Sequence, residues 1–168
     1  TGKGYRNKLT AALYNLRPAI VTQSNGGVGS IKEGFDTALT RGDSMISLDN
    51  IRGKLALAGL ESFLTEDRYQ ARIPHRQAVD IDPRRTVIMM TSNEAKLTTD
   101  LANRCSSVKM LKHDDGYQFR SYPEGDVVNH VRAHWPQYLG SVFAVVREWY
   151  SQGKPLSPDV GHDFRVWA

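Results

Sequence analysis

The sequence predicts an α/β fold in which a largely parallel sheet lies between helices in a three-layer arrangement. Two observations lead to this prediction. Segments with amphipathic helical spacing alternate along the chain with short apolar segments that are typical of buried strands. The strongest strand signal, RRTVIMMTSN at residues 84–93, contains a continuous apolar run, which is typical of a strand covered on both faces in a parallel sheet. A C-terminal helical segment is expected to follow.

The first expected elements are a helix and a strand. The helix presents an apolar stripe at helical spacing, formed by Leu9, Ala12, Leu13 and Leu16. Pro18 is expected to stop it, because proline disrupts a helix interior. Residues 19–23 (AIVTQ) predict a buried strand, which ends in a turn or loop at SNGG.

A second helix and strand follow. Ser30 is the predicted N-cap, with Glu33 as its capping-box partner, for a helix that ends near Gly42. Residues 44–48 predict a short strand that delivers Asp49 and Asn50 to its C-terminal edge. Because ligands of parallel α/β folds bind beyond this edge of the sheet, both residues are candidates for a site.

The second half of the chain continues the alternation. We expect a helix at 55–65, a hairpin or long excursion at 66–82, the strand at 84–93, a short helix at 97–105 and a strand at 107–111. Residues 114–126 predict a loop, and 127–150 predict one or two helices. The strand at 84–93 ends at Ser92 and Asn93, which are expected at the same edge as Asp49.

The composition is that of a soluble globular domain. The 168 residues include 22 Lys and Arg against 18 Asp and Glu, a small basic excess that tolerates a nucleic-acid partner without requiring one. A single cysteine, Cys105, excludes an internal disulfide, and the absence of a long apolar run or a signal-like start predicts a cytoplasmic protein without a membrane span. The five histidines show no ligand-like spacing, so no histidine or cysteine metal site is expected.

Residues 1–4 (TGKG) match the end of a phosphate-binding loop. The pattern G-x-x-x-x-G-K-[ST] lies between a strand and a helix, where backbone N–H groups and one lysine surround the phosphates. Only the last turn of such a loop is present, and Gly4 stands where a Ser or Thr would bind Mg²⁺. Alternatively, Lys3 is a surface lysine at a fraying end.

The order of four motifs carries a family resemblance. TGKG, the strand that ends in Asp49, the strand that ends in TSN, and DLANR together resemble the Walker A, Walker B, sensor 1 and arginine-finger motifs of AAA+ P-loop ATPases. Stretches such as ISLDNIRGKL, LESFLT, TSNEAKLTTDLANR and HDFRVWA are similar to replication proteins of phages and mobile elements, akin to superfamily 3 and poxvirus-type primase-helicases. The resemblance covers nearly the whole chain, and it implies a P-loop sheet flanked by helices.

The resemblance implies ATP and Mg²⁺ as cofactors. Thr1, Gly2, Lys3 and Gly4 would bind the phosphates of ATP, and Asp49 would hold Mg²⁺. Many members place a glutamate after this aspartate as the base that orients water, but this chain has Asn50, whose amide cannot accept a proton in the same way. Fast hydrolysis therefore needs another acid, such as Glu61 or Glu66. The alternative for Asp49 is a strand-end residue that caps a turn.

Two further residues would complete the catalytic set. Asn93 would act as sensor 1, and Arg104 as an arginine finger that reaches the γ-phosphate of a neighbouring subunit in a hexameric ring. In superfamily 3 helicases a hairpin before the sensor strand carries basic residues to DNA, so Arg72, His75 and Arg76 would bind single-stranded DNA. The alternatives are a turn-closing Asn93, a solvated helix-end Arg104 and a solvated charged hairpin.

These observations predict an ATPase core at residues 1–112, lacking the front of its Walker A loop, followed by a loop and C-terminal helical segment at 113–168. Without the missing donors this fragment is expected to bind ATP poorly and to be inactive by itself. The predicted function is the ATPase module of a DNA-replication helicase or primase-helicase. The alternative is a non-catalytic, P-loop-derived scaffold; a small-molecule kinase would not need DLANR.

Overall fold

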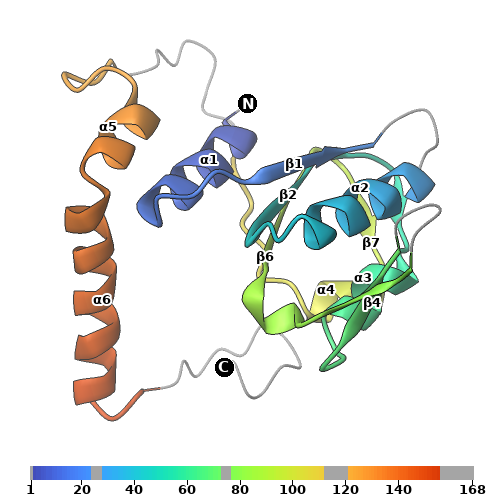
Figure 1. Ribbon diagram of the computed structural model, residues 1–168. Helices are drawn as coiled ribbons and strands as arrows, with labels where there is room; N and C mark the ends of the chain where they lie inside the picture. The colour runs from blue at the N-terminus through green and yellow to red at the C-terminus, as the bar shows by residue number, and fades with distance from the viewer. Residues whose placement is uncertain (1, 24–27, 73–76, 112–120, 156–168) are drawn as a thin grey trace. The chain divides into compact units, whose positions relative to one another are not determined.

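The computed structural model describes residues 2–23, 28–72, 77–111 and 121–155 (Figure 1). The chain divides into two compact units. The first comprises Thr1–Arg17 and Ser106–Ala168, and the second is Pro18–Cys105. This division differs from the sequence-based boundary after residue 112, because the opening helix belongs with the C-terminal helices. Each unit is described by itself below.

A small parallel sheet forms the centre of the second unit. Its strands are β1 (Ala19–Thr22), β2 (Met45–Ile51) and β6 (Val87–Ser92), in the order β1-β2-β6, and both neighbouring pairs are parallel. The expected mixed α/β class with a parallel sheet is therefore confirmed. β2 is the central strand, and its first four residues are all buried.

Helix α2 (Val28–Thr40) packs on this sheet (Figure 1). It begins before the predicted N-cap, so Ser30 lies inside the helix and that prediction was wrong. Its end matches the prediction: Gly42 adopts φ 82°, and the N–H groups of Gly42 and Asp43 donate to the carbonyls of Leu39 (2.9 Å) and Ala38 (3.1 Å). This paired cap is the Schellman motif, which favours glycine at the left-handed position.

Smaller elements complete the second unit. They are β3 (Lys54–Leu55), α3 (Ala58–Phe63), β4 (Tyr69–Ala71), β5 (Val79–Ile81), a 3₁₀ turn η1 (Pro83–Arg85), β7 (Lys96–Leu97) and α4 (Thr99–Asn103). β4 and β5 pair antiparallel, which confirms the predicted hairpin. β3 pairs parallel with β7, and this pairing occupies residues that were expected to begin two helices. Both helices therefore start later than predicted.

An apolar core links these elements. Phe35 of α2, Phe63 of α3 and Tyr69 of β4 meet edge to face, with ring centroids 5.1 to 6.1 Å apart. Such aromatic contacts stabilise a core beyond the area that they bury. The completely buried aliphatic side chains around them include Ile31, Ile46, Leu48, Leu55 and Leu101.

The strand β6 forms where predicted, but its surroundings differ from the prediction. Among the described residues β6 pairs with β2 alone, so it is an edge strand. Val87 is 51% exposed, and Thr91 is the one buried residue of the strand. The run that was expected to be buried on both faces is therefore only partly buried in the described structure.

The first unit contains α1 (Lys3–Leu13), α5 (Val127–Ala133) and α6 (Trp135–Ser151). Ala12, Val128 and Val131 form a small apolar cluster between α1 and α5. The carboxylate of Asp126 caps α5 by accepting hydrogen bonds from the N–H groups of Val128 and Asn129. The two C-terminal helices confirm the helical prediction for residues 127–150.

Two other predictions for this unit were wrong. The first helix ends at Leu13, well before Pro18, because Asn15 adopts φ 55° and forms a Schellman cap in which the N–H of Leu16 donates to the Ala11 carbonyl at 2.9 Å. The expected strand at 107–111 does not form, and Leu111 is 78% exposed.

Within the described ranges, no helix has both the length and the apolar character needed to cross a membrane.

Candidate functional site

The carboxyl ends of the three parallel strands form one edge of the second unit. Thr22 of β1 lies in register with Asp49 of β2, and Ile51 lies in register with Ser92 of β6. Gln23, directly after β1, accepts a hydrogen bond from the N–H of Arg52 at 3.3 Å. The sequence prediction that Asp49, Asn50 and the end of the TSN strand share an edge is confirmed by this register.

Asp49 is held in place by Thr91 of the neighbouring strand. The Thr91 hydroxyl donates to Oδ1 of Asp49 at 2.5 Å and accepts from the backbone N–H of Asn50 at 2.9 Å. Thr91 is only 7% exposed, so this hydroxyl is fixed by its surroundings. Thr91 thus orients Oδ1 of the Asp49 carboxylate. Within the described part of the chain, no hydrogen bond to Oδ2 is formed. Sequence reasoning did not single out Thr91, although the register of two parallel strands places it across from Asp49.

Asparagine at position 50 suits the backbone conformation there. Its φ is 55°, and the register between β2 and β6 shifts between Leu48 and Ile51. This is a β-bulge with a residue in the left-handed region, which asparagine tolerates far better than most residues. A glutamate at position 50 would have a larger backbone cost in this conformation. Asparagine is therefore well suited to the backbone conformation at position 50.

Asn93 lies directly after β6, at the same edge as Asp49, and it is exposed. The turn that begins there is organised by Ser92, whose hydroxyl oxygen accepts hydrogen bonds from the N–H groups of Glu94 (3.1 Å) and Ala95 (2.5 Å). This local bonding is that of a serine turn. Asn93 is the second residue of this turn.

The predicted phosphate-binding residues belong to the first unit. Gly2 adopts φ 70° at the N-cap of α1, and Lys3 and Gly4 form the first turn of that helix. A helix directly after GKG is what the phosphate-loop pattern predicts. Thr1 lies outside the described residues, and Asp49, Asn50, Asn93 and Arg104 all belong to the second unit.

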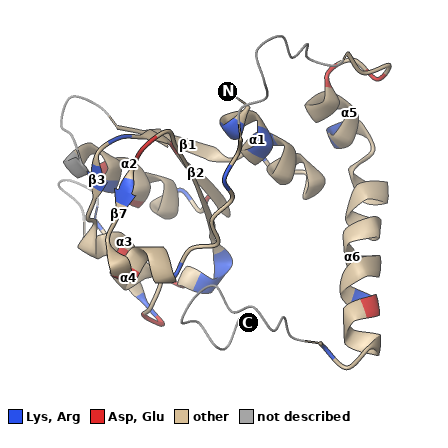
Figure 2. Cartoon of the chain, turned by 180° about the vertical axis from the view of Figure 1, so that it is seen from behind, with Lys and Arg blue, Asp and Glu red and all other residues tan. Residues whose placement is uncertain are grey.

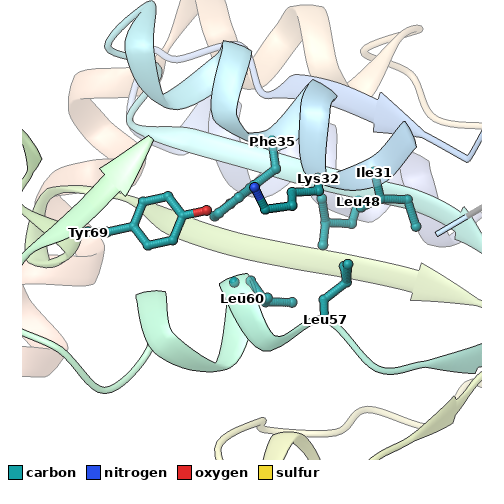
Figure 3. Close-up of a pocket in the computed structure, with 8 residues that line it drawn as sticks. Ile31, Lys32, Phe35, Leu48, Leu57, Leu60 and Tyr69 are labelled. Carbon is teal, nitrogen blue, oxygen red and sulfur yellow. The ribbon is translucent and has the colours of Figure 1, made fainter. Parts of the chain in front are cut away.

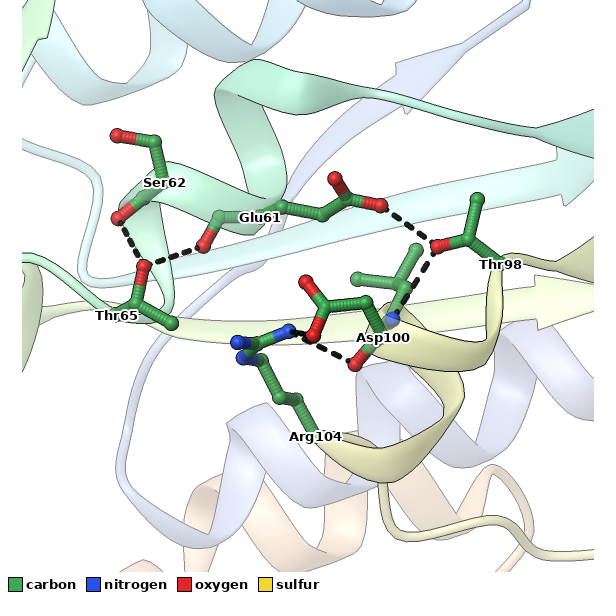
Figure 4. Close-up of polar contacts among 7 residues, drawn as sticks. Glu61, Ser62, Thr65, Thr98, Asp100 and Arg104 are labelled. Atoms are coloured by element: carbon green, nitrogen blue, oxygen red, sulfur yellow. Dashed lines mark hydrogen bonds and ion pairs between the residues drawn. The ribbon is translucent and has the colours of Figure 1, made fainter.

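Arg104 turns back onto its own helix. Its guanidinium forms an ion pair with Asp100, and Nη1 also donates to the Asp100 carbonyl at 3.0 Å (Figure 4). The Arg104 side chain is 19% exposed, and its Nε is buried with no hydrogen-bond partner among the described residues. An arginine finger in trans would have to leave Asp100 first.

Glu61, one of the substitute bases considered above, is committed to a neighbouring helix. Its Oε1 accepts a hydrogen bond from the hydroxyl of Thr98 at 2.6 Å, and Thr98 in turn caps α4 by accepting from the N–H of Leu101 at 3.2 Å (Figure 4). Glu61 therefore links α3 to α4. This structural role weakens the case for Glu61 as a base.

A buried carboxylate anchors the arginine-rich hairpin. Asp36 of α2 is 1% exposed and accepts hydrogen bonds from the Tyr69 hydroxyl (2.7 Å), the backbone N–H of Arg72 (3.2 Å) and Nζ of Lys32 (3.4 Å). Burial and the hydrogen bond to Asp36 raise the pKa of Tyr69 well above its usual range. Sequence reasoning missed Asp36, because a lone carboxylate on a helix gives no signal of its partners. Asp36 therefore fixes the base of the hairpin.

Most arginines of the hairpin region are already paired. Arg68 pairs with Asp80 (4.0 Å), and Arg84 and Arg85 pair with Asp82 (2.9 and 3.6 Å). The hydrogen bonds from Arg84 hold the pKa of Asp82 below its usual range. Lys and Arg positions are scattered along both units rather than gathered in one segment (Figure 2).

Arg72 differs from these arginines. It is exposed, and it forms no ion pair within the part of the chain that the structure describes. His75 and Arg76 lie outside the described residues. Of the three predicted nucleic-acid residues, Arg72 alone lies within the described residues, and it is exposed to solvent.

Two hollows lie beside α2 in the second unit, and Asp49 is not among the residues that line either of them. One has a volume of about 10 Å³ and lies under α2 among Tyr69, Leu57 and Leu60 (Figure 3), so it is a packing void. The other, of about 270 Å³, lies between β1 and α2 and is lined by residues such as Ile20 and Arg41. Neither supports the predicted nucleotide site.

Metal binding at the sheet edge would depend mainly on Asp49. The described residues contain no group of three or more His, Cys, Asp or Glu side chains placed to hold a metal ion. A single carboxylate completed by water and phosphate oxygens is a common arrangement for Mg²⁺, so Asp49 is chemically suited to this role.

No protein-family model, curated protein or solved structure matches the chain.

Proposed function

We propose that the chain is the ATPase module of a DNA-replication helicase or primase-helicase of the AAA+ class, from a phage or mobile element. In this proposal Thr1, Gly2, Lys3 and Gly4 bind ATP phosphates, and Asp49 holds Mg²⁺. Hydrolysis drives action on single-stranded DNA in the cytoplasm, within a hexameric ring in which Arg104 of one subunit serves its neighbour.

One observation carries the proposal. Asp49 follows four buried residues of the central strand β2, and the Thr91 hydroxyl donates to its Oδ1 at 2.5 Å, while no hydrogen bond to Oδ2 forms within the described part of the chain. A carboxylate oriented in this way at the carboxyl edge of parallel strands can hold a metal ion without further ordering. Asn93 directly follows the neighbouring strand β6, and its position is consistent with a reaction site at this same edge of the sheet.

The proposal predicts slow hydrolysis. Asn50 cannot act as a base, and Glu61 is bonded to Thr98 at 2.6 Å. Glu66 is exposed and stays the remaining candidate among the acids named from the sequence. Turnover would then depend on charge stabilisation by Mg²⁺ and Arg104 more than on proton abstraction.

ATP hydrolysis by the natural full-length protein tests this proposal. Turnover is measured with and without single-stranded DNA for the wild type, Asp49→Asn and Asp67→Asn. Asp49→Asn keeps an oxygen that can accept from Thr91, so it removes the charge with little change of shape. Asp67→Asn makes the same charge change at an exposed site. DNA-stimulated turnover that is lost only in Asp49→Asn supports the motor, whereas equal turnover in all three proteins contradicts it.

DNA binding by the hairpin is tested separately. Arg72→Glu should weaken binding of a fluorescent single-stranded oligonucleotide, and the slope of log affinity against log salt should flatten by about 0.7 for each phosphate that the variant no longer neutralises. Arg147→Glu on α6 is the control, because it makes the same charge change on an exposed residue away from the hairpin sequence. Equal effects of the two variants would show that Arg72 acts only through net charge.

A non-catalytic scaffold is the second candidate, and Asn50 favours it. Asn50 stands where the resemblance implies a catalytic glutamate, and its amide cannot accept a proton as a carboxylate does. The scaffold would retain the fold and the partner-binding hairpin without turnover. It is favoured if the full-length protein folds, binds DNA and neither binds nor hydrolyses ATP.

A further inference from the structure

The rings of two histidines lie close together at the end of α5, tilted relative to each other. His130 and His134 are four residues apart, and their ring centroids lie 4.4 Å apart with an angle of 31° between the rings. On a helix, side chains at this spacing lie one turn apart on the same face. Sequence reasoning did not single out this pair.

A hydrogen bond fixes the tautomer of one ring. Nδ1 of His134 lies 2.9 Å from the backbone carbonyl oxygen of His130, and a carbonyl can only accept, so Nδ1 carries the proton. In a neutral imidazole the lone pair is then on Nε2. Metal-binding histidines commonly donate their other ring N–H to a carbonyl in this way, because it sets both the tautomer and the ring orientation.

Nearby groups leave the pair available. Asp126, one turn before His130, already accepts hydrogen bonds from two backbone N–H groups as the cap of α5. The ring of Tyr138 meets that of His130 edge to face, with centroids 6.1 Å apart. His134 is exposed, so water can complete a coordination sphere.

We propose that His130 and His134 together bind one divalent transition-metal ion, with water as the remaining ligands. Two neutral imidazoles select the borderline ions Cu²⁺, Ni²⁺ and Zn²⁺ over Mg²⁺ and Ca²⁺, which prefer oxygen. Because His130 lies in α5 and His134 joins α5 to α6, a bound ion also links the last turn of α5 to the junction. This site is independent of the proposed ATPase function.

Titration of the untagged chain with Ni²⁺ at neutral pH tests the site. Isothermal calorimetry should show one ion bound, Cu²⁺ should bind more tightly than Ni²⁺ as the Irving–Williams order requires, and millimolar Mg²⁺ should not compete. His130→Ala and His134→Ala should each lower Ni²⁺ affinity by about 10- to 100-fold or more. His162→Ala, which removes a histidine elsewhere in the sequence, should leave the affinity unchanged.

A measurement on the wild type covers the case in which a variant misfolds. Substoichiometric Cu²⁺, which is paramagnetic, should broaden the imidazole proton resonances of two of the five histidines, and these should be the two that disappear in the variants. Ni²⁺ binding that survives loss of either histidine, displacement by Mg²⁺, or broadening of other histidines would overturn the proposal.

Discussion

Replacing Tyr69 with phenylalanine tests the anchor between α2 and the hairpin. The change removes one hydroxyl, which donates to the buried carboxylate of Asp36 at 2.7 Å, and keeps the ring that packs against Phe35 and Phe63. Hydrogen bonds to charged groups contribute about 1.5–3 kcal/mol. Tyr69→Phe should therefore lower the free energy of unfolding by about that amount and the Tm by about 3–12 °C for a chain of this size.

The assay must report on the second unit. All three tryptophans lie in the sequence of the first unit, at positions 135, 149 and 167, so tryptophan fluorescence would follow the wrong part of the chain. Tyrosine near-ultraviolet circular dichroism and amide hydrogen exchange of β2 are suitable. Tyr122→Phe is the matched control, because Tyr122 is 56% exposed and its change should have an effect below about 0.5 kcal/mol.

The pH dependence of stability gives the same prediction a second readout. The pKa of Tyr69 is raised in the folded protein, chiefly by burial and then by Asp36, so the folded state disfavours the phenolate. The contribution of Tyr69 to folding stability is complete below about pH 10, the pKa of tyrosine in the unfolded chain. It is lost as the pH rises above this value, by at most about 1.4 kcal/mol per pH unit. The difference between wild type and Tyr69→Phe should shrink above that pH. Equal stability at neutral pH, together with parallel alkaline curves, would refute the anchor.

Three other substitutions follow from the contacts described. Gly34→Ala would place Cβ 2.8 Å from Cγ1 of Val21, so we expect a loss of about 1–3 kcal/mol in urea unfolding, and an unchanged midpoint would show that the packing relaxes. Thr91→Val removes the hydroxyl that holds Asp49; under the proposed function it should weaken Mg²⁺-dependent ATP hydrolysis by the full-length protein while the fold persists by circular dichroism. Thr98→Ala removes the cap of α4 and should cost about 1 kcal/mol, whereas Thr98→Ser should restore most of it.

The order of elements in the second unit was largely predictable, because each has a strong local signal. The apolar run of β6, the strand that ends in Asp49 and the glycine stop at Gly42 all have short-range causes. The predicted element boundaries were wrong where tertiary pairing or a left-handed backbone residue sets the end of an element. Asn15 ends α1 through a left-handed cap, and the pairing of β3 with β7 competes with helix formation.

The candidate site also has features that could be predicted from the sequence and features that could not. Asn93 directly follows β6, and Asp49 lies two residues before the end of β2, which runs on past the strand predicted at 44–48; their common edge could still be predicted. The partnership of Thr91 with Asp49 and that of Asp36 with Tyr69 depend on which strand lies beside which helix. Those pairings span 42 and 33 residues, respectively, and no local pattern encodes them.

The way Asp36 holds the hairpin bears on how this protein can diversify. At position 72 the carboxylate accepts a hydrogen bond from the main-chain N–H and not from the arginine side chain. Any residue except proline supplies that donor, so substitutions at position 72 leave this bond intact. Natural variation or laboratory selection can thus change the side chain that the hairpin carries at position 72 while its base stays fixed, provided that Asp36 and Tyr69 are retained.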